Sequence, residues 1–169
     1  DPLQTPWTRF LDEVVQAGYT RIELGPFGYL PTAVPMLRAE LVQRGLSLTG
    51  ATFGGALHDP AARPGLEEQV RTIGDVVGAL GGGYLVLLPP GYRDPAGALS
   101  GPRSLNGDGW ERYVETSNHL GRLAVERFGG RLRVVFHPHA DSHVETAAQV
   151  ERYLADTDFG PAPFLGLID

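Results

Sequence analysis

The sequence predicts an α/β protein in which one parallel sheet is covered by helices. Segments with apolar residues at helical spacing alternate with short apolar runs along all 169 residues. These runs are nearly continuous, which is typical of strands buried on both faces of a parallel sheet. Two architectures fit this alternation: an open doubly wound sheet, or part of an eight-stranded barrel.

The first half of the chain contains two helix–strand units. Thr5 and Pro6 have the residue types of an N-cap and a first helical turn, and Gly18 is a typical helix end. Gly25-Pro26 closes the first strand, and Gly45 stops the second helix. The predicted elements are a helix over 6–18, a strand over 19–24, a helix over 32–44, a strand over 46–51 and a loop over 52–65.

The second half continues the same alternation. Three glycines at 81–83 end one helix, and Gly129-Gly130 ends the next. The predicted elements are a helix over 66–80, a strand over 84–88, a loop over 91–108, a helix from 110 to about 128, a strand over 132–136, a helix over 143–155 and a strand over 164–168. No linker divides residues 1–169, so we expect a single domain. Because it opens on a helix and closes on a strand, we expect it to be a piece of a longer alternation.

Composition excludes several classes of function. The net charge is −6 and no basic stripe is present, which disfavours nucleic-acid binding. All 14 basic residues are arginine, which excludes a lysine Schiff base and a P-loop lysine. The absence of cysteine excludes disulfides and thiolate metal sites. No apolar run approaches the ~20 residues of a membrane span, and the opening Asp1-Pro2-Leu3 does not resemble a signal peptide. We therefore expect a cytoplasmic protein.

The densest group of chemically active residues lies in VVFHPHADSHVET, residues 134–146. This stretch holds three of the five histidines, immediately after a predicted strand. His137 and His139 are two apart and therefore point the same way in an extended chain, and Pro138 favours that conformation. Imidazole and carboxylate together suit Mn²⁺, Co²⁺, Fe²⁺ or Zn²⁺. The alternative is that these histidines only bind backbone groups of a loop.

Other candidates also follow strands, where functional groups collect in both architectures. Glu145 has two readings: a metal or substrate ligand, or the second member of a Ser142–Glu145 capping box. Glu23 is either a site residue or the partner of an arginine such as Arg21. The remaining candidates are His58, Tyr92, Asp141, His143 and Asp169.

Two segments resemble a known family. AGYTRIELGPFGYLPT, residues 17–32, is similar to the opening of the xylose isomerase-like TIM barrels called sugar phosphate isomerases/epimerases, and within them to the inosose (2-keto-myo-inositol) dehydratase branch. HPHADSHVET, residues 137–146, resembles a segment of the same branch. The final FLGLID resembles a strand that normally continues as an Asp-Thr-Gly-His motif, with Asp169 as its aspartate.

The resemblance implies an incomplete (β/α)₈ barrel of about five parallel strands, strands two to six of eight. It implies a divalent metal, most commonly Mn²⁺ or Co²⁺, with Zn²⁺, Fe²⁺ or Mg²⁺ as alternatives. Asp169 matches the aspartate of the metal-binding motif, and Glu145 is the candidate for its first glutamate ligand. The metal would polarise a ketone and stabilise an enediolate. His137, His139 and Glu23 are the catalytic candidates, while His58, Tyr92, Asp141 and His143 are the substrate-binding candidates.

Three hypotheses follow for function. The first is a metal-dependent sugar or polyol isomerase, epimerase or dehydratase that takes a small sugar, polyol or keto-inositol and acts without a membrane or nucleic-acid partner. The second is a metal-dependent hydrolase or endonuclease on a similar barrel. The third is a non-catalytic barrel fragment, since a five-stranded parallel arc exposes two sheet edges. A homo-oligomer is compatible with each.

Overall fold

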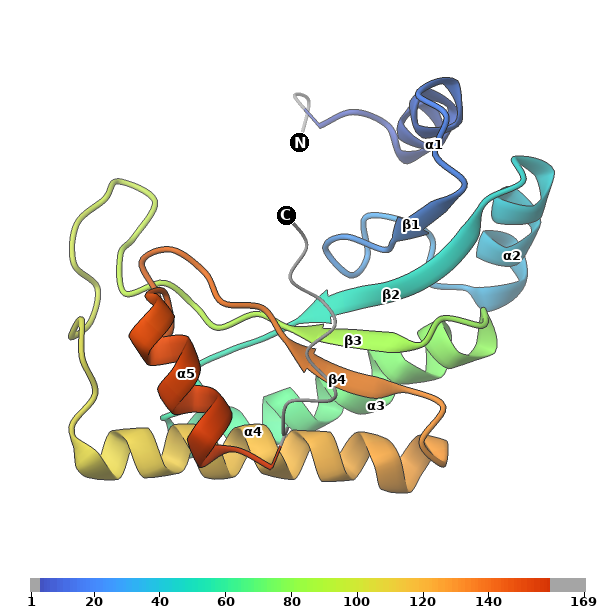
Figure 1. Ribbon diagram of the computed structural model, residues 1–169. Helices are drawn as coiled ribbons and strands as arrows, with labels where there is room; N and C mark the ends of the chain where they lie inside the picture. The colour runs from blue at the N-terminus through green and yellow to red at the C-terminus, as the bar shows by residue number, and fades with distance from the viewer. Residues whose placement is uncertain (1–3, 159–169) are drawn as a thin grey trace.

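A parallel sheet backed by helices is the main feature of the computed structural model, which describes residues 4–158 (Figure 1). Its four strands lie in the order β1-β2-β3-β4, the same as their order along the chain. The elements are α1 (Trp7–Gln16), β1 (Arg21–Glu23), α2 (Val34–Gln43), β2 (Ser47–Phe53), the short 3₁₀ helix η1 (Pro60–Ala62), α3 (Arg63–Ala79), β3 (Tyr84–Leu87), α4 (Gly107–Phe128), β4 (Arg133–Phe136) and α5 (Ala147–Asp156).

Each strand pairs in parallel with the next. Leu85 of β3 lies between Ala51 of β2 and Val134 of β4, and this register holds along both pairs. Between β1 and β2 the register shifts at Ile22/Glu23, which marks an irregularity just before the end of β1. The carboxyl ends of all four strands therefore meet at one edge of the sheet.

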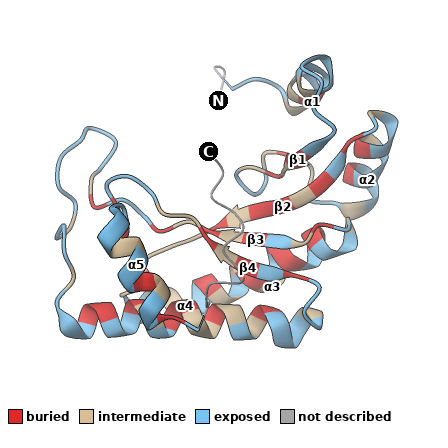
Figure 2. Ribbon diagram, in the orientation of Figure 1, coloured by how far each residue is buried: buried red, intermediate tan, exposed pale blue. Residues whose placement is uncertain are grey.

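The core lies between the sheet and helices α3 and α4 (Figures 1 and 2). Leu85 and Leu87 of β3 are fully buried against these helices, whereas Val86, which points to the opposite face, is only half buried. β4 repeats the pattern, with Val135 half buried between two buried neighbours. The prediction of strands buried on both faces is thus met on one face only within residues 4–158.

Several helices differ from the prediction at their first residues, because of the local hydrogen bonds found there. α1 begins after Pro6 and receives no side-chain cap, so the expected capping role of Thr5 is wrong. α3 begins earlier than predicted because η1 leads into it, with the Asp59 side chain accepting from the Ala61 N–H at 2.9 Å. α4 begins at Gly107 because the Asn106 side chain caps it, accepting from the Gly109 N–H at 2.8 Å.

The start of α5 is the largest correction. The sequence predicts a helix over 143–155, with a Ser142–Glu145 capping box as one of two readings of Glu145, but the helix begins at Ala147. Its capping box is formed by Thr146 and Gln149 instead. The Ser142 hydroxyl is engaged within its own loop, by Val144 N–H and Val144 C=O at 3.2 Å each. Glu145 therefore precedes the helix and is free of a capping role.

The fifth predicted strand, 164–168, lies outside the described residues. Within residues 4–158, no helix combines the length and apolar character that a bilayer crossing needs.

Candidate functional site

The carboxyl edge of the sheet collects most of the predicted site residues. Glu23 ends β1, His58 lies in the β2–α3 loop (54–59), and Tyr92 lies in the β3–α4 loop (88–106). The other candidates occupy the β4–α5 loop (137–146), which Figure 1 shows beside the β3–α4 loop. The sequence prediction that parallel strand ends bring these loops to one edge is therefore confirmed.

His137 and His139 stand directly after β4. The His137 N–H donates to the Leu87 carbonyl at 3.0 Å and so extends the strand ladder by one residue. The two imidazole rings lie with their centroids 6.0 Å apart, inclined by 49°. His139 Nδ1 is 2.8 Å from the Ala140 carbonyl oxygen, which can only accept. In the neutral ring Nδ1 therefore carries the hydrogen, and Nε2 is left as a proton acceptor.

Polar contacts join the β3–α4 loop to the β4–α5 loop. The Tyr92 hydroxyl donates to Glu145 Oε1 at 3.0 Å, and the Tyr92 N–H donates to the Asp141 carbonyl at 2.7 Å. Arg93 Nε donates to Asp141 Oδ1 at 2.9 Å. The Asp141 N–H completes the network by donating to Glu145 Oε2 at 2.7 Å. We call these four side chains, Tyr92, Arg93, Asp141 and Glu145, the loop clamp.

Asp141 has an unusual backbone within the loop clamp. Its φ of 59° makes it the non-glycine residue with positive φ among residues 4–158. Most side chains disfavour this left-handed conformation, although Asp and Asn tolerate it better than others. The conformation lets the Asp141 N–H point at Glu145 while its carbonyl accepts from Tyr92. Local strain of this kind is typical of functional loops.

His58 and His143 form a second histidine pair beside the loop clamp. Their rings meet edge to face with centroids 5.3 Å apart, and His143 also lies 6.2 Å from the rings of Tyr92 and Tyr113. His143 is buried, and its Nδ1 lies 3.3 Å from the Arg103 carbonyl. This contact assigns the hydrogen of the neutral ring to Nδ1.

Burial lowers the pKa of His58, and the neighbouring His143 and Arg112 lower it further, while Asp59 raises it. His58 Nδ1 is buried and finds no hydrogen-bond partner among residues 4–158. A neutral imidazole with an unpaired nitrogen is suited to accept from or donate to a small hydroxylated ligand.

The β2–α3 loop that carries His58 is fixed on both sides. Gly54 exchanges two hydrogen bonds of 3.2 Å with the Gln69 side chain of α3. A Cβ atom at Gly54 would lie 1.9 Å from the Leu88 carbonyl oxygen, so only glycine fits this approach to β3. Arg112 Nε donates to the His58 carbonyl at 3.1 Å. These contacts hold His58 close to the β4–α5 loop.

Glu23 is half buried at the end of β1, and no ion pair to Arg21 or another arginine is found for it among the described residues. Asp169, the other predicted metal ligand, lies outside the described residues. Within residues 4–158, no three His, Asp or Glu side chains are close enough together to hold a metal ion. The described part alone therefore does not fit a divalent metal.

Sequence patterns assigned no role to Arg93, Gln69 and Arg112, whose side chains hold the loops of the site in the structure. Arg93 had a usable signal, because it follows one strand and the oppositely charged Asp141 follows the next. Gln69 and Arg112 lie on helices and act on backbone groups of a distant loop, a contact that leaves no local pattern. His119 lies on α4, away from the site, with its Nε2 2.8 Å from Glu67 Oε1 of α3.

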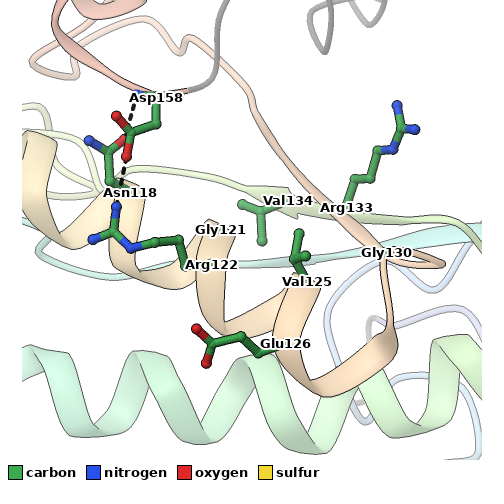
Figure 3. Close-up of a pocket in the computed structure, with 9 residues that line it drawn as sticks. All are labelled: Asn118, Gly121, Arg122, Val125, Glu126, Gly130, Arg133, Val134 and Asp158. Atoms are coloured by element: carbon green, nitrogen blue, oxygen red, sulfur yellow. Dashed lines mark hydrogen bonds and ion pairs between the residues drawn. The ribbon is translucent and has the colours of Figure 1, made fainter.

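A separate cavity of about 510 Å³ lies away from this edge (Figure 3). It is formed by α4, the start of β4 and the Arg122–Asp158 ion pair of 2.7 Å, and it contains none of the predicted site residues. Its lining residues are Asn118, Gly121, Arg122, Val125, Glu126, Gly130, Arg133, Val134 and Asp158.

Comparisons with known proteins show what the sequence and the fold of this chain resemble. No protein-family model matches the chain. An inosose dehydratase of Bacillus licheniformis is 28% identical over 162 residues, a match that covers 88% of this chain and 48% of that protein. The chain thus spans about half the length of the curated relatives it matches.

Solved structures show the same fold. A xylose isomerase-like TIM barrel protein from Mycobacterium smegmatis, in complex with magnesium, superposes with a TM-score of 0.67 at 15% identity; the match covers 89% of this chain and 52% of that one. A D-allulose 3-epimerase from Methylomonas sp., in complex with D-allulose, superposes with a TM-score of 0.67 at 20% identity. The match covers 88% of this chain and 52% of that one.

Proposed function

From a fold shared with xylose isomerase-like barrels and a sequence similar to inosose dehydratases, we propose that this chain carries part of the active site of an isomerase, epimerase or dehydratase acting on a small sugar or polyol. Its finer form is loss of water from a keto-inositol through an enediolate. The observation that carries the proposal is the pair of strand-end histidines, with ring centroids 6.0 Å apart and His139 Nδ1 2.8 Å from the Ala140 carbonyl oxygen. A cytoplasmic location and assembly into homo-oligomers belong to the same proposal.

We assign the two histidines complementary roles in proton transfer. His139 Nε2 removes a proton from the carbon beside the substrate ketone, which gives the enediolate. His137 gives a proton to the hydroxyl on the next carbon, which leaves as water and produces an unsaturated ketone. In an isomerase or epimerase, the proton is returned to carbon instead and no water is lost. Glu23 is proposed to assist this proton transfer from the end of β1.

Substrate contact is proposed for His58, Asp141 and His143. His58 and His143 present imidazole edges at the loops that border the strand ends, and Asp141 lies exposed in the β4–α5 loop. Hydroxyl groups of a sugar suit these donors and acceptors. The Mn²⁺ or Co²⁺ implied by the resemblance would need Asp169 in addition to Glu145. No reaction step is assigned to a metal here.

The test uses proton exchange as well as product formation. The full chain is incubated with inosose in D₂O, and substrate and product are followed by NMR. Wild type should exchange the proton beside the ketone and then lose water. His139→Gln should slow exchange by about a hundredfold or more, since it removes the base.

His119→Gln is the matched control because it makes the same change on the helix layer, and its exchange rate should stay within about twofold of wild type. Equal exchange by wild type and His139→Gln would contradict the role of His139. Turnover of a model phosphodiester without proton exchange would favour the hydrolase hypothesis instead.

A further inference from the structure

We propose that Tyr92 is a positioning residue that aims the Glu145 carboxylate, rather than a residue that binds substrate. The inference rests on the proposed function, in which the β4–α5 loop carries reacting groups. The β3–α4 loop, which carries none of the proposed catalytic residues, would then take part in setting the geometry of the site.

The hydroxyl, the N–H and the carbonyl of Tyr92 each form a hydrogen bond within or between the two loops. The hydroxyl donates to Glu145 Oε1 at 3.0 Å, and the N–H donates to the Asp141 carbonyl at 2.7 Å. The Tyr92 carbonyl accepts from the Ser100 N–H at 2.9 Å, within its own loop. The hydrogen of the Tyr92 hydroxyl is engaged by Glu145, so a substrate hydroxyl could bind this group only by donating to its oxygen.

The ring of Tyr92 is buried between neighbouring side chains. It is 7% exposed, with the His143 ring 6.2 Å away and the Arg93 guanidinium carbon 5.9 Å from its centroid. A buried phenol surrounded in this way has a fixed direction, so its hydroxyl is held at Glu145.

Glu145 receives one donor on each carboxylate oxygen. Tyr92 supplies one and the Asp141 N–H the other, so both the position and the rotation of the carboxylate plane are set. Hydrogen bonds to an ionised acceptor are stronger than neutral ones. They also offset the cost of the left-handed backbone at Asp141. Losing the Tyr92 hydroxyl would free Glu145 to rotate while leaving its charge intact.

Tyr92→Phe tests this because it removes only the hydroxyl. A positioning role predicts a kcat lowered by about tenfold to a hundredfold, with KM within about twofold of wild type. In a Glu145→Gln background, Tyr92→Phe should have no further effect, because there is no carboxylate left to aim. Tyr29→Phe is the matched control: its hydroxyl also donates to a loop, at Thr5 C=O, 2.8 Å away.

A second readout does not depend on turnover. Hydrogen exchange at the Asp141 amide reports directly on its bond to Glu145 Oε2. Tyr92→Phe should accelerate this exchange by about fivefold, and Tyr29→Phe should leave it unchanged. If the wild-type chain transforms no sugar, the proposed function fails, and this exchange still decides the role of Tyr92.

Three results would overturn the proposal. The first is a raised KM with unchanged kcat in Tyr92→Phe, and the second is additive losses in the double variant; either would indicate substrate contact. The third is an Asp141 amide that exchanges at the wild-type rate in Tyr92→Phe.

Discussion

On the face covered by α3 and α4, Leu85 and Leu120 are fully buried among other apolar side chains, whereas at the carboxyl edge Tyr92, Asp141 and Glu145 meet through hydrogen bonds. Apolar burial contributes about 25 cal/mol per Å² and is not directional. A hydrogen bond contributes only about 1 kcal/mol net but depends on geometry. The helix layer therefore supplies most of the free energy of unfolding, and the edge supplies orientation. Substitutions can separate the two contributions.

The largest effect is expected in the core between the sheet and helices α3 and α4. Leu85→Ala removes a fully buried side chain and should lower the free energy of unfolding by ~2–5 kcal/mol, through lost burial and the cavity left behind. Urea denaturation measures it. Val125→Ala, at a site 52% exposed, is the control and should change it by less than ~0.5 kcal/mol. If Leu85→Ala lowered the free energy of unfolding by less than ~1 kcal/mol, apolar burial would not be the main source of stability on this face.

A smaller and more local effect is expected at Asp141. Asp141→Ala forces a side chain with low tolerance for φ 59° into the left-handed region, at a cost of ~1–2 kcal/mol. Asp141→Gly also removes the pair with Arg93 but accepts this backbone, so it should destabilise less. Hydrogen exchange of the β4–α5 loop measures both. Identical exchange in the two variants would assign the effect to the ion pair alone.

The smallest effect is a pH dependence carried by His58. Burial lowers its pKa from the ordinary 6.5, so below that value the unfolded chain binds more protons than the folded one. The stability due to neutral His58 is present above about pH 6.5 and is lost as the pH falls. The groups facing it are His143 and Arg112, which oppose its charge, and Asp59, which favours it.

Urea midpoints of wild type and His58→Gln, compared at about pH 7.5 and about pH 5.5, measure this term. The difference between the two pH values should be smaller in His58→Gln than in wild type. If both proteins show the same difference, the pH dependence belongs to other groups.

The sequence predicted the elements well where burial decides them. The apolar runs at β3 and β4 and the glycines after α3 and α4 placed these elements to within a few residues. The predicted start of α5 was wrong. The sequence contains two possible capping boxes there, and the Ser142 hydroxyl accepts from the Val144 N–H instead of capping a helix. Choosing between them requires the tertiary contacts of the loop, such as the His139 N–H to Val144 C=O bond of 3.3 Å.

The sequence predicted where the candidate residues lie but not how they are arranged. His137, His139 and Glu145 follow β4 at the carboxyl edge, because parallel strands bring their ends to one edge. The sequence did not predict that His58 and His143 contact each other, since both lie in irregular loops whose path no periodicity encodes. The left-handed backbone of Asp141 could not be predicted from the sequence either, because aspartate is common in ordinary turns.

The strand order β1-β2-β3-β4 bears on how the chain is assembled during synthesis. Each strand pairs with the one made just before it, so every helix–strand unit finds its docking surface already present when it leaves the ribosome. Growth by addition to one edge avoids waiting for distant partners and keeps the loop that closes each pairing short. Translation and folding of this sheet can therefore proceed in the same direction, one unit at a time.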